Sequence, residues 1–391
     1  MSQPSPESSN ELEFIFLGTG TSSSLPQIKC LTAPPGGRVC KTCLSTLNSE
    51  GKKNARRNTS ALVRVKDKHG DPKVIVIDVG KTFLAAALEW FPKYGLRKID
   101  AVLITHAHAD AMNGLDDLRG WTLNNNIQPY IDIYASCETF NEVGRAFPYL
   151  VSKEFASGGG DVPEFRWHTI SDMVPFEIGN TGIKITPFSV HHGRVFSKPP
   201  AFSGMLPTPQ YTSPPTPLSG RNSPSQTIIN SSSIQRQLDE LANCNDRIEP
   251  YLCTGFKIQD AVVYISDVSY IPEEVWRFLL QGQTQIPMFI LDCLRIKSHT
   301  SHFGLKQAVE TVRRLKAQRS YLVGFTHDLS HEEYTEILRS MSGDNVDLES
   351  ASKLVLEAVE LVKGEPQWTR PAYDGLRVFV SENGTIRESG Y

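Results

Sequence analysis

Short apolar runs alternate with polar turns along most of the chain. The runs at residues 73–78 and 101–104 have the length and β-branched content of buried strands. Apolar residues at helical spacing predict helices at residues 82–91 and 303–315. Further strands are expected at residues 13–17, 130–134, 183–190, 261–266, 288–291 and 321–325. Because strands precede helices repeatedly, the pattern predicts the mixed α/β class.

Two segments interrupt this alternation. Residues 1–11 are polar and are expected to form a disordered tail. Residues 199–248 are rich in proline, serine and threonine and cannot bury enough apolar area to offset the entropy of ordering. Candidate ligands lie on both sides of this segment, so we interpret it as a disordered insertion within one domain that covers residues 12–391. Its Ser-Pro and Thr-Pro pairs could be phosphorylated, and binding of a protein partner is an alternative role.

Composition narrows the classes of function. The net charge of −3 gives no general attraction to nucleic acid or to an anionic membrane, and no apolar run is long enough to span a bilayer. The N-terminal residues lack the basic and apolar regions of a secretory signal. We therefore expect a cytoplasmic protein, with the nucleus as the alternative. Composition leaves both a monomer and a homodimer open.

The candidate chemistry lies directly after the predicted strands. His106, His108 and Asp110 follow the strand at 101–104, and two imidazoles and a carboxylate so close together are typical of a zinc or manganese site. His192 and Asp267 each follow a further strand, as do His302 and His327, which lie later in the chain. Such strand-end residues are expected to meet at one edge of a sheet.

The ordered series His106, His108, Asp110, His192, Asp267 and His327 resembles the ligand series of the metallo-β-lactamase fold. Within that superfamily the chain is most similar to the phosphoribosyl 1,2-cyclic phosphate phosphodiesterase branch. Three features carry this second resemblance: Cys30 followed by Cys40-x-x-Cys43, His302 before a helix, and Thr326-His327 followed by Ser330-His331. The resemblance implies an αββα sandwich with the metal site at the sheet edges.

The resemblance also implies a role for each residue. His106, His108 and His192 would hold a first Zn²⁺ or Mn²⁺, and Asp267 would bridge it to a second metal held by Asp110 and His327. Cys30, Cys40, Cys43 and His331 would bind a structural Zn²⁺. Asp110 would orient the nucleophile, and His302 would donate a proton to the leaving group. The family normally has His where this chain has Ala111, so we expect the second metal to bind weakly or not at all.

These expectations point to a metal-dependent hydrolase. The leading hypothesis is a phosphodiesterase that uses a metal-activated water on a small phosphate ester, with cyclic esters as one candidate class. A nuclease that processes tRNA 3′ ends is the second hypothesis, and the acidic net charge argues against it. A scaffold that keeps the fold without catalysis is the third, and the retention of the other ligands argues against that.

Overall fold

The computed structural model describes residues 11–37, 39–158, 160–195, 249–282 and 285–390. The predicted tail at residues 1–11, apart from Glu11, and the predicted insertion at 199–248 therefore lie outside the described residues. Contacts between Cα atoms divide the chain into one unit of Met1–Gly193 with Tyr251–Tyr391 and a second unit, Arg194–Pro250. The first unit contains all the elements that carry candidate ligands.

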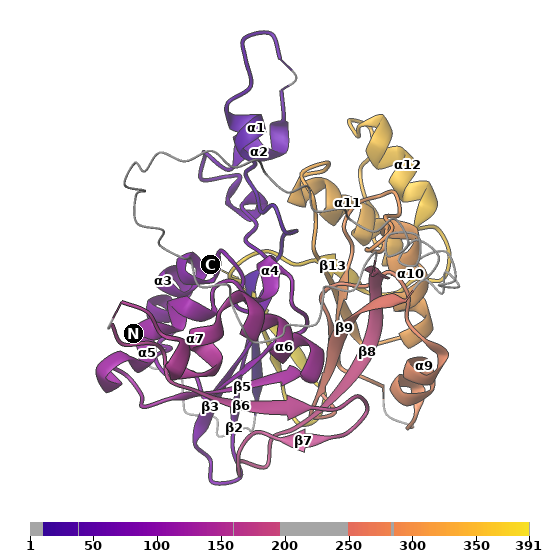
Figure 1. The fold of residues 1–391 in the computed structure, drawn as a ribbon. Coiled ribbons are helices and arrows are strands. Elements are labelled where there is room, and N and C mark those ends of the chain that lie inside the picture. The colour runs from indigo at the N-terminus through magenta and orange to yellow at the C-terminus, as the bar shows by residue number, and fades with distance from the viewer. Residues whose placement is uncertain (1–10, 38, 159, 196–248, 283–284, 391) are drawn as a thin grey trace, which may run out of the picture. The chain divides into compact units, whose positions relative to one another are not determined.

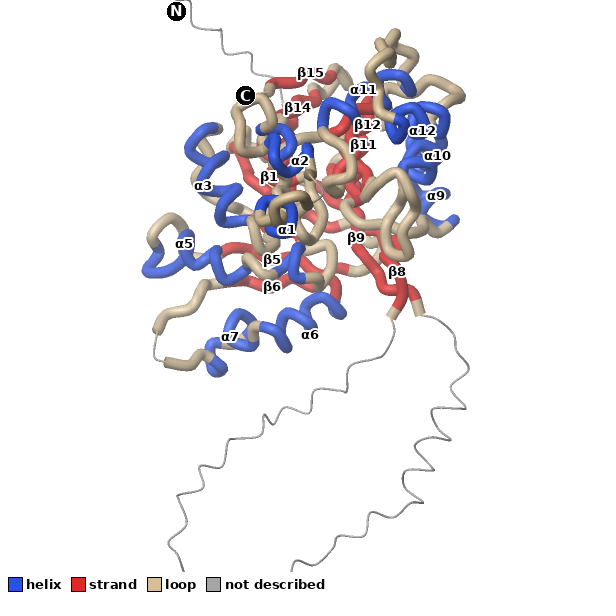
Figure 2. The backbone as a smooth tube through the Cα atoms, turned by 90° about the horizontal axis from the view of Figure 1, so that it is seen from above, coloured by secondary structure: helices blue, strands red, loops and turns tan. Residues whose placement is uncertain are grey.

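Two mixed sheets form the centre of this unit (Figures 1 and 2). The first sheet has the order β15 (Ile386–Ser389), β14 (Arg377–Val380), β1 (Leu12–Gly18), β2 (Ser60–Lys66), β3 (Pro72–Ile77), β4 (Ala101–Leu103), β5 (Ile131–Ser136) and β6 (Phe165–Ile170). The second has the order β13 (Thr369–Pro371), β12 (Arg319–Val323), β11 (Met288–Asp292), β10 (Val262–Ile265), β9 (Pro250–Ile258), β8 (Lys184–Arg194) and β7 (Phe176–Glu177).

Helices cover the outer face of each sheet, as Figures 1 and 2 show. On the first sheet lie α3 (Phe83–Lys93), α5 (Arg119–Thr122), α6 (Cys137–Ala146) and α7 (Pro148–Val151). On the second lie α9 (Glu273–Leu280), α10 (Leu305–Leu315), α11 (His331–Met341) and α12 (Lys353–Leu361). The short helices α1 (Ile28–Leu31), α2 (Lys41–Ser45) and α4 (Ala109–Met112) belong to connections beside the sheets.

Three buried apolar clusters hold these layers together. Phe14 and Phe16 of β1 meet Tyr264 and Tyr321 of the opposite sheet in the central cluster. A second cluster joins the first sheet to α3 through side chains such as Trp90, and a third joins the second sheet to α9–α12. Alternate residues of each strand face different clusters, which is the arrangement that a sheet covered on both faces requires. The predicted αββα sandwich is confirmed.

Parallel pairing brings the ends of the ligand-bearing strands to one edge. β3 pairs in parallel with β4, and β10, β11 and β12 are parallel to one another. The chain therefore leaves all of these strands in the same direction within each sheet, and their following loops gather at that edge. In the described residues, no helix is both long enough and apolar enough to cross a bilayer.

Candidate metal centre

Three imidazoles from different parts of the chain meet at the sheet edge. His106 and His108 lie on the loop after β4, whereas His192 lies near the end of β8. Ligand atoms of the three rings lie within 4.8 Å of one another, and His192 Nε2 is 3.2 Å from His108 Nδ1. Three imidazoles at this separation match the protein ligands of a tetrahedral site that keeps one position open.

Hydrogen bonds on the far side of two rings fix which nitrogen faces the centre. The Thr105 hydroxyl donates its proton to Asp78 Oδ2 at 2.8 Å. The Thr105 oxygen therefore accepts the hydrogen bond from His106 Nδ1, also at 2.8 Å. Within the described part of the chain, the buried His106 Nε2 has no hydrogen-bond partner. His192 Nδ1 is 2.7 Å from the Ser301 carbonyl oxygen, which leaves His192 Nε2 as an acceptor. The buried His106 Nε2, which has no hydrogen-bond partner and lies beside the ligand nitrogens of His108 and His192, fits a metal ion.

The electrostatics of the centre keep these ligands in their metal-binding form. Burial lowers the pKa of His106 to about 3 and that of His108 to about 4. Burial acts to raise the pKa of Asp267, but the nearby His192 and His106 outweigh it and lower that pKa to about 2. Neutral imidazoles and an ionised carboxylate are the states in which these groups coordinate metals.

The two predicted aspartates have different neighbours. Asp267, after β10, has a ligand oxygen close to His106 and Cys253, and also close to His192 and His302. Asp110, in α4, joins no group of three metal-ligating side chains among the residues that the structure describes. Burial, together with the charge of Asp267, raises the pKa of Asp110 to about 6.

A glycine allows the histidine loop to lie against the end of β3. A Cβ atom on Gly80 would be 1.7 Å from the carbonyl oxygen of Asp110, so only glycine fits at this position. The backbone of the same loop is tied down by Val79, whose N–H donates to the Ala111 carbonyl at 2.8 Å. The Asp-Val-Gly sequence after β3 therefore supports the ligand loop.

His302 lies beside the imidazole cluster and is paired with a buried carboxylate. Its ring packs edge-on against His192 with 4.7 Å between the centroids, and its Nδ1 is 2.9 Å from Asp292 Oδ2 and 3.5 Å from Asp267 Oδ1. Burial acts to lower the pKa of His302, but Asp292 and Asp267 outweigh it and raise the pKa to about 9. His302 therefore carries a proton near neutral pH, as a general acid requires. The sequence reasoning missed Asp292, although it ends strand β11.

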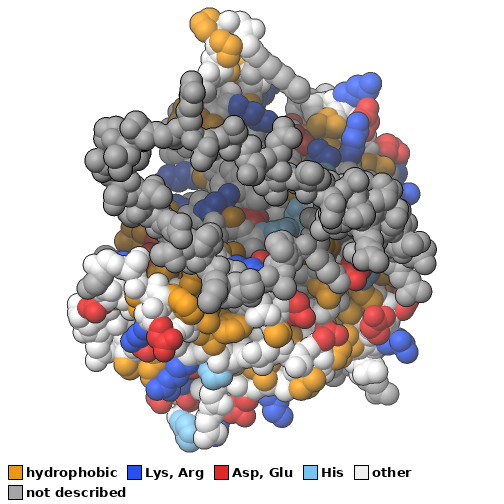
Figure 3. All heavy atoms as spheres, viewed as in Figure 1, with side chains coloured by type: hydrophobic (Ala, Val, Ile, Leu, Met, Phe, Trp, Pro, Cys, Tyr) orange, Lys and Arg blue, Asp and Glu red, His pale blue; other side chains and the backbone are white. Residues whose placement is uncertain are grey.

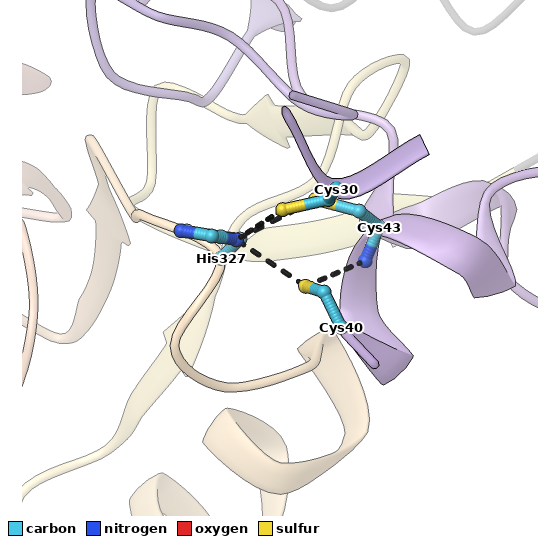
Figure 4. Close-up of side chains that lie close together, drawn as sticks. All are labelled: Cys30, Cys40, Cys43 and His327. Atoms are coloured by element: carbon cyan, nitrogen blue, oxygen red, sulfur yellow. Dashed lines mark hydrogen bonds between the residues drawn. The ribbon is translucent and has the colours of Figure 1, made fainter. Parts of the chain in front are cut away.

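A second cluster joins three thiols to a histidine (Figure 4). His327 Nδ1 lies 3.3 Å from the sulfur of Cys30, 3.2 Å from that of Cys40 and 3.6 Å from that of Cys43. Three sulfurs around one imidazole nitrogen is the ligand set of a closed, structural zinc site. The cluster links the α1–α2 segment to the loop that follows β12.

The position of His327 departs from the prediction, which gave His331 to the thiols and His327 to a second catalytic metal. His331 is the first residue of α11, which is capped by the Ser330 side chain. The helix start directs the His331 ring against Tyr373, with 5.2 Å between the centroids, and its backbone N–H donates to Asn54 at 2.7 Å. Three residues separate the two histidines. The turn that these three residues form places His327, and not His331, at the thiols.

Two residues of β9 border the imidazoles and were not anticipated. The ring of Tyr251 stacks on His108 at 4.6 Å with 5° between the planes, and its hydroxyl accepts the Ala107 N–H at 3.2 Å. The buried thiol of Cys253 lies 3.7 Å from His106 Nδ1. Both residues follow the Pro/Ser/Thr-rich segment, and no local sequence signal links them to a loop more than 140 residues earlier.

Histidine side chains are visible near the centre of the face drawn in Figure 3, with lysine and arginine side chains above them. Among the cations, Lys81 is close enough to lower the pKa of Asp110, although burial and Asp267 outweigh its effect. Its amino group donates to the Ser22 carbonyl oxygen at 2.7 Å. The surroundings of the centre therefore include groups that suit an anionic ligand.

Comparisons with known proteins agree with this architecture. Residues 73–206 match the family model of the β-lactamase superfamily domain. A solved diphosphatase from the PhnP family superposes with a TM-score of 0.59 at 21% identity, covering 97% of this chain and 99% of that one. The metallo-β-lactamase fold protein YhfI from Bacillus subtilis gives a TM-score of 0.51 at 12% identity, covering 94% of this chain and 98% of that one.

A curated protein from Porphyromonas gingivalis, named octanoyltransferase, is 23% identical over 371 residues. The match covers 95% of this chain, which spans about half, 52%, of the length of that relative. The superfamily match includes the loop with His106, His108 and Asp110, and each of the two solved structures is matched over at least 94% of this chain. The chain therefore has the metallo-β-lactamase fold, and its residues 73–206 match the model of the β-lactamase superfamily domain.

Proposed function

We propose that the protein is a metal-dependent phosphodiesterase that hydrolyses small phosphate esters, cyclic esters included. The observation that carries the proposal is the convergence of His106 Nε2, His108 Nδ1 and His192 Nε2, with Asp267 adjacent. These four side chains would hold Zn²⁺ or Mn²⁺. When bound, that ion would supply Lewis-acid activation of water and of the phosphoryl oxygen.

The remaining groups supply proton transfer and charge. His302 would donate its proton to the departing alkoxide, and Asp292 would hold its ring by the 2.9 Å contact at Nδ1. Lys81 would favour a phosphate anion over a neutral substrate. One structural neighbour is a diphosphatase, which further supports a phosphorus-centred substrate.

The thiol cluster belongs to the same proposal. Cys30, Cys40, Cys43 and His327 would bind a structural Zn²⁺. Burial raises the pKa of Cys43 to about 12, so zinc binding must release thiol protons and should weaken as the solution is acidified. This second ion would hold the α1–α2 segment against the loop after β12.

Turnover of a substrate panel tests the proposal. Full-length protein loaded with Zn²⁺ or Mn²⁺ would be assayed on a cyclic phosphodiester, a linear phosphodiester, a dinucleoside diphosphate, a precursor tRNA and an octanoyl thioester. We expect hydrolysis of small phosphodiesters that a chelator abolishes, and His106→Ala should lower kcat/KM by at least about 10³-fold, because it removes a metal ligand. The exposed His69→Gln serves as the matched control and should retain wild-type turnover.

Two outcomes would overturn the assignment. Cleavage of precursor tRNA without turnover of small esters would favour the nuclease alternative. Turnover of the thioester alone would favour acyl chemistry, which is included in the panel because the curated relative is named an octanoyltransferase.

A further inference from the structure

The catalytic pocket has one position that is surrounded by enough side-chain ligands to bind a metal ion. His106, His108 and His192 direct three nitrogens to a common point, and Asp267 lies beside it. Three imidazoles are enough protein ligands for a single catalytic ion, with Asp267 beside them and a position left for water. A second ion needs a comparable set of donors on the side of Asp110.

The first missing donor is at position 111. Ala111 is 2% exposed and its methyl group offers no lone pair. Its backbone is also committed, because its carbonyl oxygen accepts the Val79 N–H at 2.8 Å. Position 111 therefore contributes nothing to a metal.

The second missing donor is the last histidine of the ligand series. His327 Nδ1 is 3.2–3.6 Å from three sulfurs, so this nitrogen is part of the thiol cluster. Across the described ranges, the only group of three or more metal-ligating side chains that includes His327 is the one with the three cysteines. Asp110 belongs to no such group in the same ranges.

The third candidate donor, His302, is occupied by a different partner. Its Nδ1 lies 2.9 Å from Asp292 but 3.5 Å from Asp267, so the shorter contact orients the ring towards Asp292. Asp292 is completely buried and also accepts the Val268 N–H at 3.2 Å, which fixes the carboxylate in place.

From this geometry we infer that the catalytic pocket binds one metal ion, at the three imidazoles and Asp267, and that the second metal of the resembled ligand series does not bind at all. The residues on the Asp110 side do not fit a second ion. Asp110 and Asp267 are two carboxylates without a nitrogen donor between them, and two ligands hold a transition metal weakly. This inference rests on the proposed metal-dependent function and specifies its metal count.

Counting metals separately at the two clusters tests the inference. The thiol cluster prefers zinc, whereas imidazole and carboxylate ligands also accept manganese. Protein that carries Zn²⁺ at the thiols would be titrated with Mn²⁺, with bound ions measured by calorimetry and by electron paramagnetic resonance. We expect one tightly bound Mn²⁺ per wild-type chain, with the spectrum of an isolated ion.

Two variants make the count specific. His106→Ala should lose the tightly bound Mn²⁺ and keep the zinc, while Asp110→Ala should still bind one Mn²⁺. Two tightly bound Mn²⁺ per wild-type chain, falling to one in Asp110→Ala, would overturn the single-metal inference.

The count also separates this inference from the proposed function. A wild-type protein that binds two Mn²⁺ and hydrolyses phosphodiesters would refute the single site while leaving the hydrolase intact. A protein that binds no ion at the imidazoles would refute both.

Discussion

Backbone shape at single positions sets the geometry of the metal ligands. Gly193, directly after His192, has φ of +79°, and a Cβ atom there would come within 3.0 Å of the Ser301 side chain. This close approach lets the Ser301 carbonyl oxygen accept from His192 Nδ1 at 2.7 Å. Glycine is thus needed both for the left-handed conformation and for the contact that orients a ligand.

Gly193→Ala should therefore weaken metal binding as well as folding. The left-handed conformation costs a residue with a Cβ about 1–2 kcal/mol, and relief of the crowding would move Ser301 away from His192. We expect a lower melting temperature and a weaker Mn²⁺ affinity in calorimetry. Gly70→Ala is the matched control, because Gly70 also has positive φ but has open space around its Cβ position. If both variants lose stability and only stability, the glycine has no role in orienting His192.

The positions of His327 and His331 could not be told apart from the sequence. The sequence identifies both histidines and all three cysteines, since their residue types and spacing are visible. The choice between the two histidines depends on the turn at residues 327–330 and on the Ser330 cap, which set the direction of each ring. Side-chain direction of this kind is a property of the folded loop.

The start of helix α11 supports a prediction about acid stability. His331 is 7% exposed, and burial together with the nearby Arg56 and Lys53 lowers its pKa to about 3. The unfolded chain therefore binds a proton near pH 6.5 that the folded chain excludes, so His331 stabilises the fold above that pH and this contribution falls on acidification.

His331→Gln should flatten this pH dependence. Between about pH 7 and pH 5, wild-type protein should lose roughly 2 kcal/mol of unfolding free energy to this one group, and the variant should be spared that loss. Urea unfolding at both pH values measures the difference, with the exposed His69→Gln as control. Equal acid sensitivity of wild type and His331→Gln would mean that the His331 imidazole is not held neutral.

A buried arginine, Arg56, connects the segment that precedes β2 to the loop that carries His327. Arg56 donates to the carbonyl oxygens of Thr326 at 2.5 Å and Leu329 at 3.2 Å, at the two ends of the loop that carries His327. Its guanidinium also lies 5.5 Å from the centroid of the Phe325 ring. This one side chain therefore fixes the loop that brings His327 to the thiols.

Arg56→Met should lower the unfolding free energy by roughly 2–4 kcal/mol, since buried carbonyl groups would lose charged hydrogen-bond donors. It should also speed the loss of zinc to a chelator, measured with a chromogenic zinc indicator. Arg145→Met is the control, because Arg145 pairs with Glu142 on the surface of α6 and should matter by less than about 1 kcal/mol. A stability loss with unchanged zinc release would limit Arg56 to a packing role.

Strands and helices were predictable to different degrees. The expected strands at 73–78, 101–104 and 288–291 correspond to β3, β4 and β11, because continuous apolar runs mark strands buried on both faces. Strand β6 was missed, since its exposed polar residues interrupt the apolar pattern. Strand β9, which begins directly after the Pro/Ser/Thr-rich segment, was also missed. Helix α12 was missed although Ser352 caps its start.

Over the whole chain, the mixed α/β class followed from the order of strands and helices, whereas the αββα sandwich was an expectation from the family resemblance. The imidazole cluster followed from the strand-end histidines. The side-chain contacts that support the cluster did not, because they join residues far apart in sequence. One example is the 2.7 Å contact between His192 Nδ1 and the carbonyl oxygen of Ser301, which lies 109 positions later in the chain. Such contacts depend on the completed fold, and a single sequence carries no signal for them.

The thiol cluster gives a prediction for the entire molecule. Cys43→Ser should remove one equivalent of zinc, measured by mass spectrometry of the metals, and should lower the melting temperature because structural zinc contributes folding free energy. The exposed Cys137→Ser is the matched control and should change neither quantity. Unchanged zinc content in Cys43→Ser would exclude the thiol cluster as a metal site.

The cysteine and histidine ligands of this cluster are far apart in the sequence, so they are synthesised at different times. Cys43 and His327 are separated by 284 positions, so a zinc ion that joins them closes most of the 391-residue chain into a ring. In the unfolded state, closing a ring of that length costs about 6 kcal/mol of chain entropy, which binding of the fourth ligand must offset. A ribosome-bound chain could hold zinc through its three cysteines long before His327 emerges, but only loosely. Tight binding of zinc during translation would therefore require that His327, on the loop after β12 of the second sheet, has reached the three cysteines.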